Sequence, residues 1–302
     1  MKVAIMTDTH SGIMPEEARE KGIFLLNAPF MVDGEQYLEG INLNSETFYE
    51  KLESGADVST SQSSPGDILN MWDEILKEYD QVVCIPLSSS LTGAYQTMSM
   101  LASEEPYEGR VFPVDNRSVS IVQRLAVEGA LGLVKKGYTG EEIKKILEYT
   151  REDNIIYITV TTLKYLKKGG RITPAAAALG SLLKIKPVLE IDGGKLDAFS
   201  KVRTMSQAKE TMLNAIQQAL DDRFKDHDGS HSFIFLAHTQ NEEMAKELEA
   251  MAKERWPKAV FFIEPLPLAI ACHIGPGSLA IAAVRKIDKL KDSKEYNERI
   301  SE

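Results

Sequence analysis

The sequence predicts an α/β protein, with an N-terminal parallel-sheet α/β domain followed by a C-terminal α+β domain. In the first half, short apolar runs such as residues 3–8 and 82–87 alternate with segments of helical periodicity. Repeated strand–helix units of this length are typical of a parallel sheet with helices on both faces. In the second half, an Asp-Gly-Gly turn at residues 192–194 joins two β-like runs and predicts an antiparallel hairpin over residues 187–202.

The helices of the first half carry recognisable capping signals. Ser64 is a natural N-cap, with Pro65 in the first turn and Asp67 completing a partial capping box, and Thr139 with Glu142 forms a second box. The expected helices cover residues 15–22, 45–55, 64–79, 91–102, 118–137 and 141–152. The expected strands cover residues 2–8, 23–32, 82–87 and 110–115.

The second half has a different pattern of elements, in which helices separate strands that we expect to be antiparallel. The expected strands cover residues 154–162, the hairpin, 232–238, 260–266 and 278–286. The expected helices cover residues 163–170, 172–185, 204–224 and 241–256, the last capped by Thr239 and Glu242. Pro265–Val284 is long and apolar enough to cross a bilayer, but its prolines and glycines break it, so we expect two buried strands around a bend.

A chain of 302 residues fits two domains of ordinary size. We expect the N-terminal domain over residues 1–153 and the C-terminal domain over 154–288, with a strand near the C-terminus as a candidate for exchange between them. Residues 289–302 read as a charged tail.

The composition indicates a cytoplasmic protein that does not bind nucleic acid. Apolar residues make up 43% of the chain, and the net charge of -10 disfavours nucleic acid and anionic membrane surfaces as partners. The N-terminus has no apolar run long enough for a secretory signal, so we expect no membrane span and at most transient membrane contact. Cys84 and Cys272 lie in apolar runs and are expected to be buried free thiols.

Familiar catalytic signatures are missing from the sequence. It contains no GxGxxG, GxxxxGK[ST], HExxH or GxSxG string, and its five histidines are scattered rather than placed at metal-ligand spacing. This pattern argues most strongly against a metalloenzyme. It argues only weakly against enzymes in general. We expect no catalytic residues, no metal and no cofactor.

Two hydroxyl-rich loops lead into helices, and we expect both to lie at strand ends. The first covers residues 59–66, and the second covers residues 88–93. Loops in these positions lie at the carboxyl ends of parallel strands, where ligands bind, and they place hydroxyls and backbone N–H groups at helix N-termini. The pattern suits an anion such as a carboxylate or phosphate, although ordinary N-caps give the same composition.

Three further segments could contact an anion. Residues 167–171 (Lys-Lys-Gly-Gly-Arg) form either the basic C-terminal end of a helix or a segment whose basic side chains or backbone cover a bound anion. His273, which precedes a Gly-Pro-Gly turn, is either a satisfied core histidine or a donor to a bound anion. Arg203 follows the hairpin and, taken alone, is most simply a surface arginine.

Taken together, these elements resemble the DegV family of fatty-acid-binding proteins along nearly the whole chain. The string LKYLKKGGRI at residues 163–172 matches the family's pattern without departure, and residues 60–66 are similar to its TSQPSPG string. Residues 88–96 are similar to SSGLSGTYQ, with Ser90 in the place of a glycine and Thr92 in the place of a serine. Thr7-Asp8-Thr9, Lys186-Pro187, Lys201-Val202-Arg203 and His273–Gly277 complete the ordered set.

The resemblance implies a long-chain fatty acid, such as palmitate, stearate or oleate, held in the cleft between the two domains with its acyl chain in an apolar tunnel. Thr60 and Thr92 would be the direct carboxylate ligands, Arg171 and His273 would support them, and Arg203 would lie where a partner kinase docks to phosphorylate the carboxylate. The chain would then be the binding subunit of a bacterial fatty acid kinase system, without catalytic activity of its own. The ligand-binding residues expected are Thr60, Ser61, Ser89, Thr92, Gly93, Arg171, His273, Gly275 and Gly277.

Two alternatives stay open on the residues alone. A phosphotransferase or small-molecule hydrolase could use the same hydroxyl loops around a phosphate, with Asp8 or Asp115 as base or metal ligand. A pure interaction module would use the same loops only as helix caps.

Overall fold

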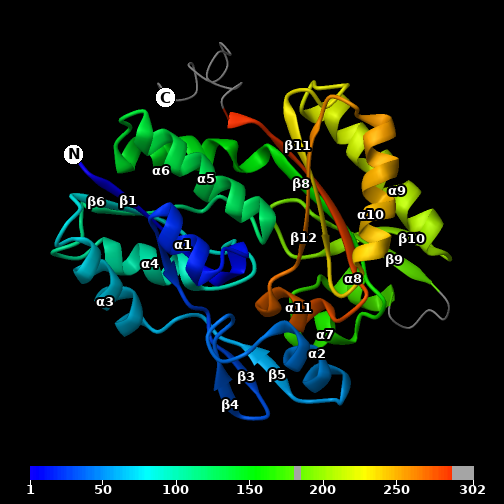
Figure 1. Ribbon diagram of the computed structural model, residues 1–302, viewed down its shortest axis with the longest axis horizontal. Coiled ribbons are helices and arrows are strands. Elements are labelled where there is room, and N and C mark those ends of the chain that lie inside the picture. Colours follow the sequence, from blue (N-terminus) through cyan, green and yellow to red (C-terminus); the bar gives the residue numbers. More distant parts are fainter. Residues whose placement is uncertain (180–184, 288–302) are drawn as a thin grey trace. The chain divides into compact units, whose positions relative to one another are not determined.

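The computed structural model describes residues 1–179 and 185–287 (Figure 1). These residues form two compact units. The first unit comprises Met1–Arg151 together with Pro267–Ala269, and the second comprises Glu152–Leu266 together with the described residues from Ile270 on. The predicted charged tail and part of the predicted helix at 172–185 lie outside the described residues.

The first unit is built on a four-stranded parallel sheet in the order β2-β1-β6-β7 (Figure 1). Its strands are β1 (Val3–Asp8), β2 (Ile23–Leu26), β6 (Gln81–Ile85) and β7 (Val111–Pro113). Every residue of β1 is buried, as expected for a central parallel strand covered on both faces. The mixed α/β prediction for this half of the chain is confirmed.

Helices cover both faces of this sheet. They are α1 (Pro15–Lys21), α3 (Pro65–Ile75), α4 (Ala94–Ala102), α5 (Ile121–Lys135) and α6 (Gly140–Tyr149). Helix α2 (Ser45–Glu53) lies elsewhere in the unit, where its Phe48 packs against Phe30. On one face, Trp72 of α3 and Met98 of α4 pack with Met6 and Cys84 of the sheet. Helices α5 and α6 lie along β1, β6 and β7 on the other face (Figure 1). The predicted capping boxes at the starts of α3 and α6 are both present.

The predicted single strand at residues 23–32 is two strands in two different sheets. After β2, residues 27–29 leave the parallel sheet and lead into β3 (Phe30–Val32). Strand β3 pairs with β4 (Glu35–Tyr37) and β5 (Val58–Thr60) in a small antiparallel sheet. Pro29 has no N–H to donate to a strand ladder, so the chain changes sheets there.

The second unit is built on a six-stranded sheet in the order β10-β9-β8-β13-β11-β12 (Figure 1). Its strands are β8 (Asn154–Thr159), β9 (Lys186–Ile191), β10 (Asp197–Val202), β11 (Ser232–His238), β12 (Val260–Pro265) and β13 (Leu279–Arg285). The predicted hairpin is confirmed as the antiparallel pair β9–β10. Neighbouring strands are antiparallel except for β11 and β12, which run parallel, so the sheet is mostly antiparallel, as is typical of an α+β domain.

Two long helices, α9 (Met205–Gln218) and α10 (Glu242–Arg255), cover one face of this sheet. Their buried side chains, such as Leu213 and Leu248, meet Ile234 and Ile281 of the strands. A short π-helical turn at Ala219–Arg223 extends α9, and two short helices, α7 (Lys164–Gly169) and α8 (Pro174–Ala178), follow β8. No helix in residues 1–179 or 185–287 is long and apolar enough to cross a membrane.

The prediction of two strands within Pro265–Val284 is half wrong. Leu268–Ile274 forms helix α11, and only β13 is a strand. Both carboxylate oxygens of Glu39 accept from the backbone N–H of Leu268, at 2.9 and 3.0 Å, and so cap the first turn of the helix. A cap supplied 229 residues away leaves no local signal in the sequence.

The predicted cap of α10 is also wrong. Asn241 precedes the helix and makes no side-chain cap hydrogen bond, while the hydroxyl of Thr239 bonds elsewhere. Cys84 and Cys272 are buried and are not joined in a disulfide, as predicted, and burial raises the pKa of Cys84 to about 12.

We predict that Leu213→Ala lowers the free energy of unfolding of the second unit by about 2–5 kcal/mol, because it opens a cavity between α9 and the sheet. Urea denaturation followed by circular dichroism measures the change. Ser206→Ala, on the exposed side of the same helix, is the control and should shift stability by less than about 0.5 kcal/mol. Equal stability of the two variants would contradict this packing.

Candidate functional site

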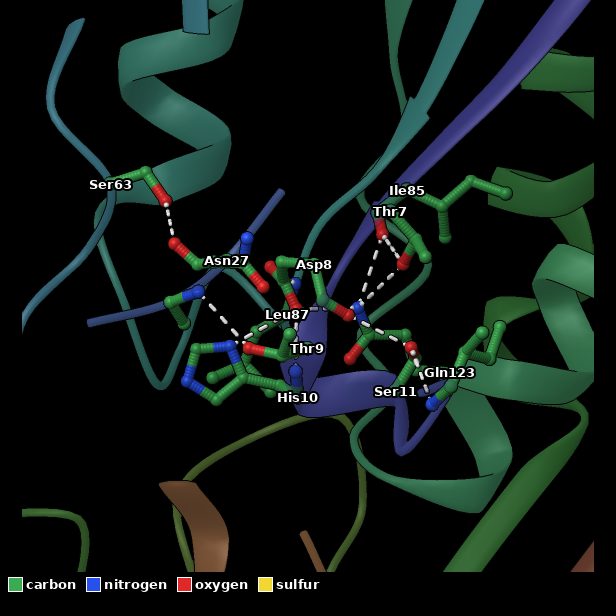
Figure 2. A network of polar contacts seen from close by, with 12 residues as sticks. Thr7, Asp8, Thr9, His10, Ser11, Asn27, Ser63, Ile85, Leu87 and Gln123 are labelled. Carbon is green, nitrogen blue, oxygen red and sulfur yellow. Dashed lines mark hydrogen bonds and ion pairs between the residues drawn. The ribbon is translucent and has the colours of Figure 1, made fainter. Parts of the chain in front are cut away.

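A buried carboxylate organises the carboxyl edge of the parallel sheet. Asp8, the last residue of β1, is 4% exposed (Figure 2). Its Oδ1 accepts from the backbone N–H of His10 at 3.1 Å and lies 3.0 Å from the Nδ1 of the His10 ring. Its Oδ2 accepts from the backbone N–H of Leu87 at 2.9 Å. Asp8 therefore fixes both the turn after β1 and the start of the second hydroxyl loop.

The charge of Asp8 is stabilised despite burial. Burial alone would raise the pKa of this carboxyl, but the attraction and hydrogen bond of His10, with the bonds from Leu87 and Gln123, lower it on balance. Asp8 is thus an acceptor committed to the loops rather than a free base. Asp115 is similarly engaged, because Ser89 donates its hydroxyl to Oδ2 at 2.7 Å and its backbone N–H to Oδ1 at 3.2 Å.

Gln123 of α5 completes this network. Its side-chain amide donates to the Thr7 hydroxyl at 3.1 Å, to Asp8 at 3.0 Å and to the carbonyl of Ile85 at 3.1 Å. It therefore ties β1, β6 and α5 together at one point. The sequence does not single out Gln123, because a glutamine within a long helix normally faces water.

The first hydroxyl loop is attached to β1 through the segment that links β2 and β3. The hydroxyl of Thr9 accepts from the backbone N–H of Ala28 at 3.0 Å, and the hydroxyl of Ser63 donates to the carbonyl of Asn27 at 3.0 Å (Figure 2). The backbone N–H of Ser61 donates to the carbonyl of Pro29 at 3.1 Å. Thr60 ends β5, so these bonds fix its position relative to the edge of the parallel sheet.

The two hydroxyl loops lie side by side. Gln62 of the first loop donates its side-chain amide to the hydroxyl of Thr97 in α4 at 3.0 Å. A Cβ on Gly93 would lie only 3.0 Å from the Oε1 of the same glutamine. In the second loop, the backbone N–H of Thr92 donates to the carbonyl of Ser88 at 3.2 Å. Ser90 does not have a positive φ, so a serine is accommodated where the family has glycine.

The second unit brings Arg171 and His273 to the same helix end. Arg171 donates its guanidinium to the carbonyl of Gly169, the last residue of α7. The ring of His273 packs against the same glycine so closely that a Cβ there would lie 2.3 Å from Nδ1. Gly275 is similarly close to the ring of Tyr165. The meeting of these residues with Thr60 and Thr92 stays a prediction.

Arg203, the predicted docking residue, is exposed after β10. Its backbone N–H donates to the side chain of Gln207 at 3.0 Å, within the capping box that starts α9. In the described part of the chain, no three histidine, cysteine, aspartate or glutamate side chains are grouped closely enough to hold a metal ion.

Comparison with known proteins decides the family. A family model described as "Uncharacterised protein, DegV family" matches residues 2–286. The chain belongs to the DegV family. A DegV domain-containing protein of Mycoplasmopsis pulmonis is 30% identical over 289 residues, which cover 96% of each chain.

Solved DegV structures have the same fold. The structure of a DegV family protein from Thermus thermophilus, described by its fatty acid binding, has a TM-score of 0.85 and 28% identity, covering 94% of this chain and 100% of that one. DegV from Bacillus subtilis, described as a fatty acid binding protein, has a TM-score of 0.82 and 27% identity, covering 95% and 100%. The resemblance found in the sequence and the fold it implied are therefore confirmed.

We predict that Asp8→Asn destabilises the first unit by about 2–4 kcal/mol at pH 7. In either orientation, the new amide turns its NH₂ toward an existing donor, Leu87 or the group formed by His10 and Gln123. The folded pKa of Asp8 lies below its ordinary value of 3.8. Its contribution is thus fully present above about pH 4 and is lost as the pH falls through the folded pKa.

Urea midpoints measured from pH 2.5 to 7 test this prediction. Acidification should erode the stability of the wild type more steeply than that of Asp8→Asn, so that the two curves converge at low pH. Glu20→Gln, an exposed carboxylate on α1, should follow the wild type throughout. Parallel curves for wild type and Asp8→Asn would mean that Asp8 is not the anchor described.

Proposed function

We propose that this DegV protein binds a long-chain fatty acid and has no catalytic activity of its own. The observation that carries the proposal is the match, over nearly the full length of both chains and at 27–28% identity, to DegV proteins described as fatty acid binding. The paired hydroxyl loops of the first unit support it, since they combine hydroxyls and backbone N–H groups at the start of α3 and α4.

The proposed chemistry divides the ligand into an anionic head and an apolar chain. Thr60 and Thr92 donate to the carboxylate, while Arg171 and His273 assist by charge or hydrogen bonding. Burying about 15 methylenes contributes on the order of 12 kcal/mol before costs. Lost translation and chain ordering offset much of this gain, so the polar contacts decide which ligands are retained.

The proposal extends to a partner. A bound fatty acid with its carboxylate fixed is a substrate for a kinase that forms an acyl phosphate, and the exposed Arg203 is the proposed docking residue. The engagement of Asp8 and Asp115 in internal hydrogen bonds disfavours the alternative of a phosphotransferase or hydrolase that uses either carboxylate.

We predict that the purified protein carries a fatty acid that organic extraction and mass spectrometry detect. After delipidation, isothermal titration with oleate or palmitate should show binding. Thr60→Val and Thr92→Val should each weaken binding by about tenfold, because each removes one hydroxyl donor to a charged group. Thr47→Val on α2, in the same unit, is the matched control. Lipid-free protein that ignores both fatty acids would overturn the proposed function.

We also predict that Gly169→Ala weakens fatty acid binding while it leaves the fold intact. The added Cβ would occupy the space of the His273 ring, 2.3 Å from Nδ1, and the ring must move away. Gly194→Ala, whose Cβ would meet only the carbonyl of Asp192 at 4.0 Å, should bind as the wild type does. Equal affinity of the two variants would remove His273 from the site.

A further inference from the structure

Thr239 makes four hydrogen bonds to the turn that follows His273. It is fully buried at the end of β11. Its hydroxyl donates to the carbonyl of Gly275 at 2.7 Å and accepts from the backbone N–H of Ser278 at 2.9 Å. Its own carbonyl accepts from the N–H of Gly277 at 2.7 Å, and its N–H donates to the carbonyl of Ser278 at 3.2 Å. One residue thus satisfies both ends of the turn.

Side chains from other segments brace the same turn. The hydroxyl of Thr161, after β8, donates to the carbonyl of Pro276 at 2.9 Å. The amide of Asn241 donates to the carbonyl of Gly277 at 3.1 Å. Together with Thr239, these residues give each of three consecutive carbonyls a side-chain donor. Gly275 and Gly277 have φ of +77° and +76°, so the turn has a backbone that other residues rarely adopt.

The turn sets where helix α11 ends. His273 belongs to the last turn of α11, two residues before Gly275. Its ring is held against Gly169, so a small displacement of the turn would change the direction in which the imidazole points. Thr239 bonds to the backbone of this turn, so its effect on His273 passes through the main chain.

We propose that Thr239 is a positioning residue that fixes the orientation of His273 toward the ligand carboxylate; this inference rests on the proposed fatty acid binding. The hydroxyl, rather than the shape of the side chain, carries the effect. Valine keeps the β-branched shape but leaves the N–H of Ser278 without its side-chain partner, and leaves the carbonyl of Gly275 with only the longer bond of 3.3 Å from the Ser278 hydroxyl. Serine keeps the hydroxyl and should restore the turn.

Oleate binding by the delipidated full-length chain tests the proposal. Thr239→Val should weaken binding by about tenfold, and Thr239→Ser should stay within about twofold of the wild type. Ser232→Ala is the matched control, because it removes a buried hydroxyl bond to Asp226 at the opposite end of β11. It should lose stability but keep its affinity for oleate.

A double-mutant cycle separates positioning from a general loss of stability. If Thr239 acts through His273, Thr239→Val combined with His273→Ala binds oleate no more weakly than His273→Ala alone. Additive losses, or a Thr239→Val protein with wild-type affinity, would overturn the inference. Should Thr239→Val fail to fold, Thr161→Val serves instead, because it removes the bond from this exposed residue after β8 to the carbonyl of Pro276 in the turn. It should weaken binding about threefold with the same non-additivity.

A readout without ligand keeps the two proposals apart. The imidazole signals of His273, assigned by their loss in His273→Ala, should shift in the NMR spectrum of Thr239→Val and stay in place in Ser232→Ala. If the wild type binds no fatty acid, the proposed function fails, and the position of these signals still decides whether Thr239 orients His273. Unchanged His273 signals in Thr239→Val would refute the positioning role.

Discussion

The arrangement of the first unit depends on the interaction between the Asp8 carboxylate and the groups that surround it. A buried charge is costly unless donors replace the lost water, and here the donors come from three different segments of the chain. Leu87 lies at the start of the second hydroxyl loop, His10 lies in the turn after β1, and Gln123 belongs to α5. Because one anion satisfies all of them, the loops cannot shift independently without leaving that charge unpaired.

In the second unit, the turn after α11 is held by neutral groups. This turn has no buried charge at its centre, and its carbonyls are instead matched one by one with hydroxyl and amide donors. Glycine is needed at Gly169 and Gly275 because aromatic or imidazole rings occupy the space that a Cβ would fill. Close packing of rings on bare backbone is therefore what gives His273 a defined position.

Sequence reasoning succeeded where the partners are neighbours in the chain. The capping boxes of Ser64 with Asp67 and of Thr139 with Glu142 span three residues, and the β9–β10 hairpin has its turn residues between its strands. It failed where the deciding partner is remote. Glu39 caps α11 from 229 residues away, and Gln123 reaches Asp8 across 115. The ordered motifs identified the candidate ligand-binding residues. No motif identified the residues whose hydrogen bonds position the surrounding loops and helices.

Thr239 illustrates the limit, because its spacing from Glu242 is that of a capping box and yet it does not cap α10. At the start of α10, Glu242 is exposed and pairs with Lys246 at 2.6 Å, and water can reach the first N–H groups, so a side-chain cap there is worth about 1 kcal/mol. Gly275 and Ser278 are buried, and each polar group left unpaired there costs about 1–3 kcal/mol. One hydroxyl that satisfies both groups gains more than it would as a cap. Thr239 therefore bonds to the turn, because unpaired buried groups there would cost more than an uncapped helix start. The burial that sets this cost exists only in the folded chain.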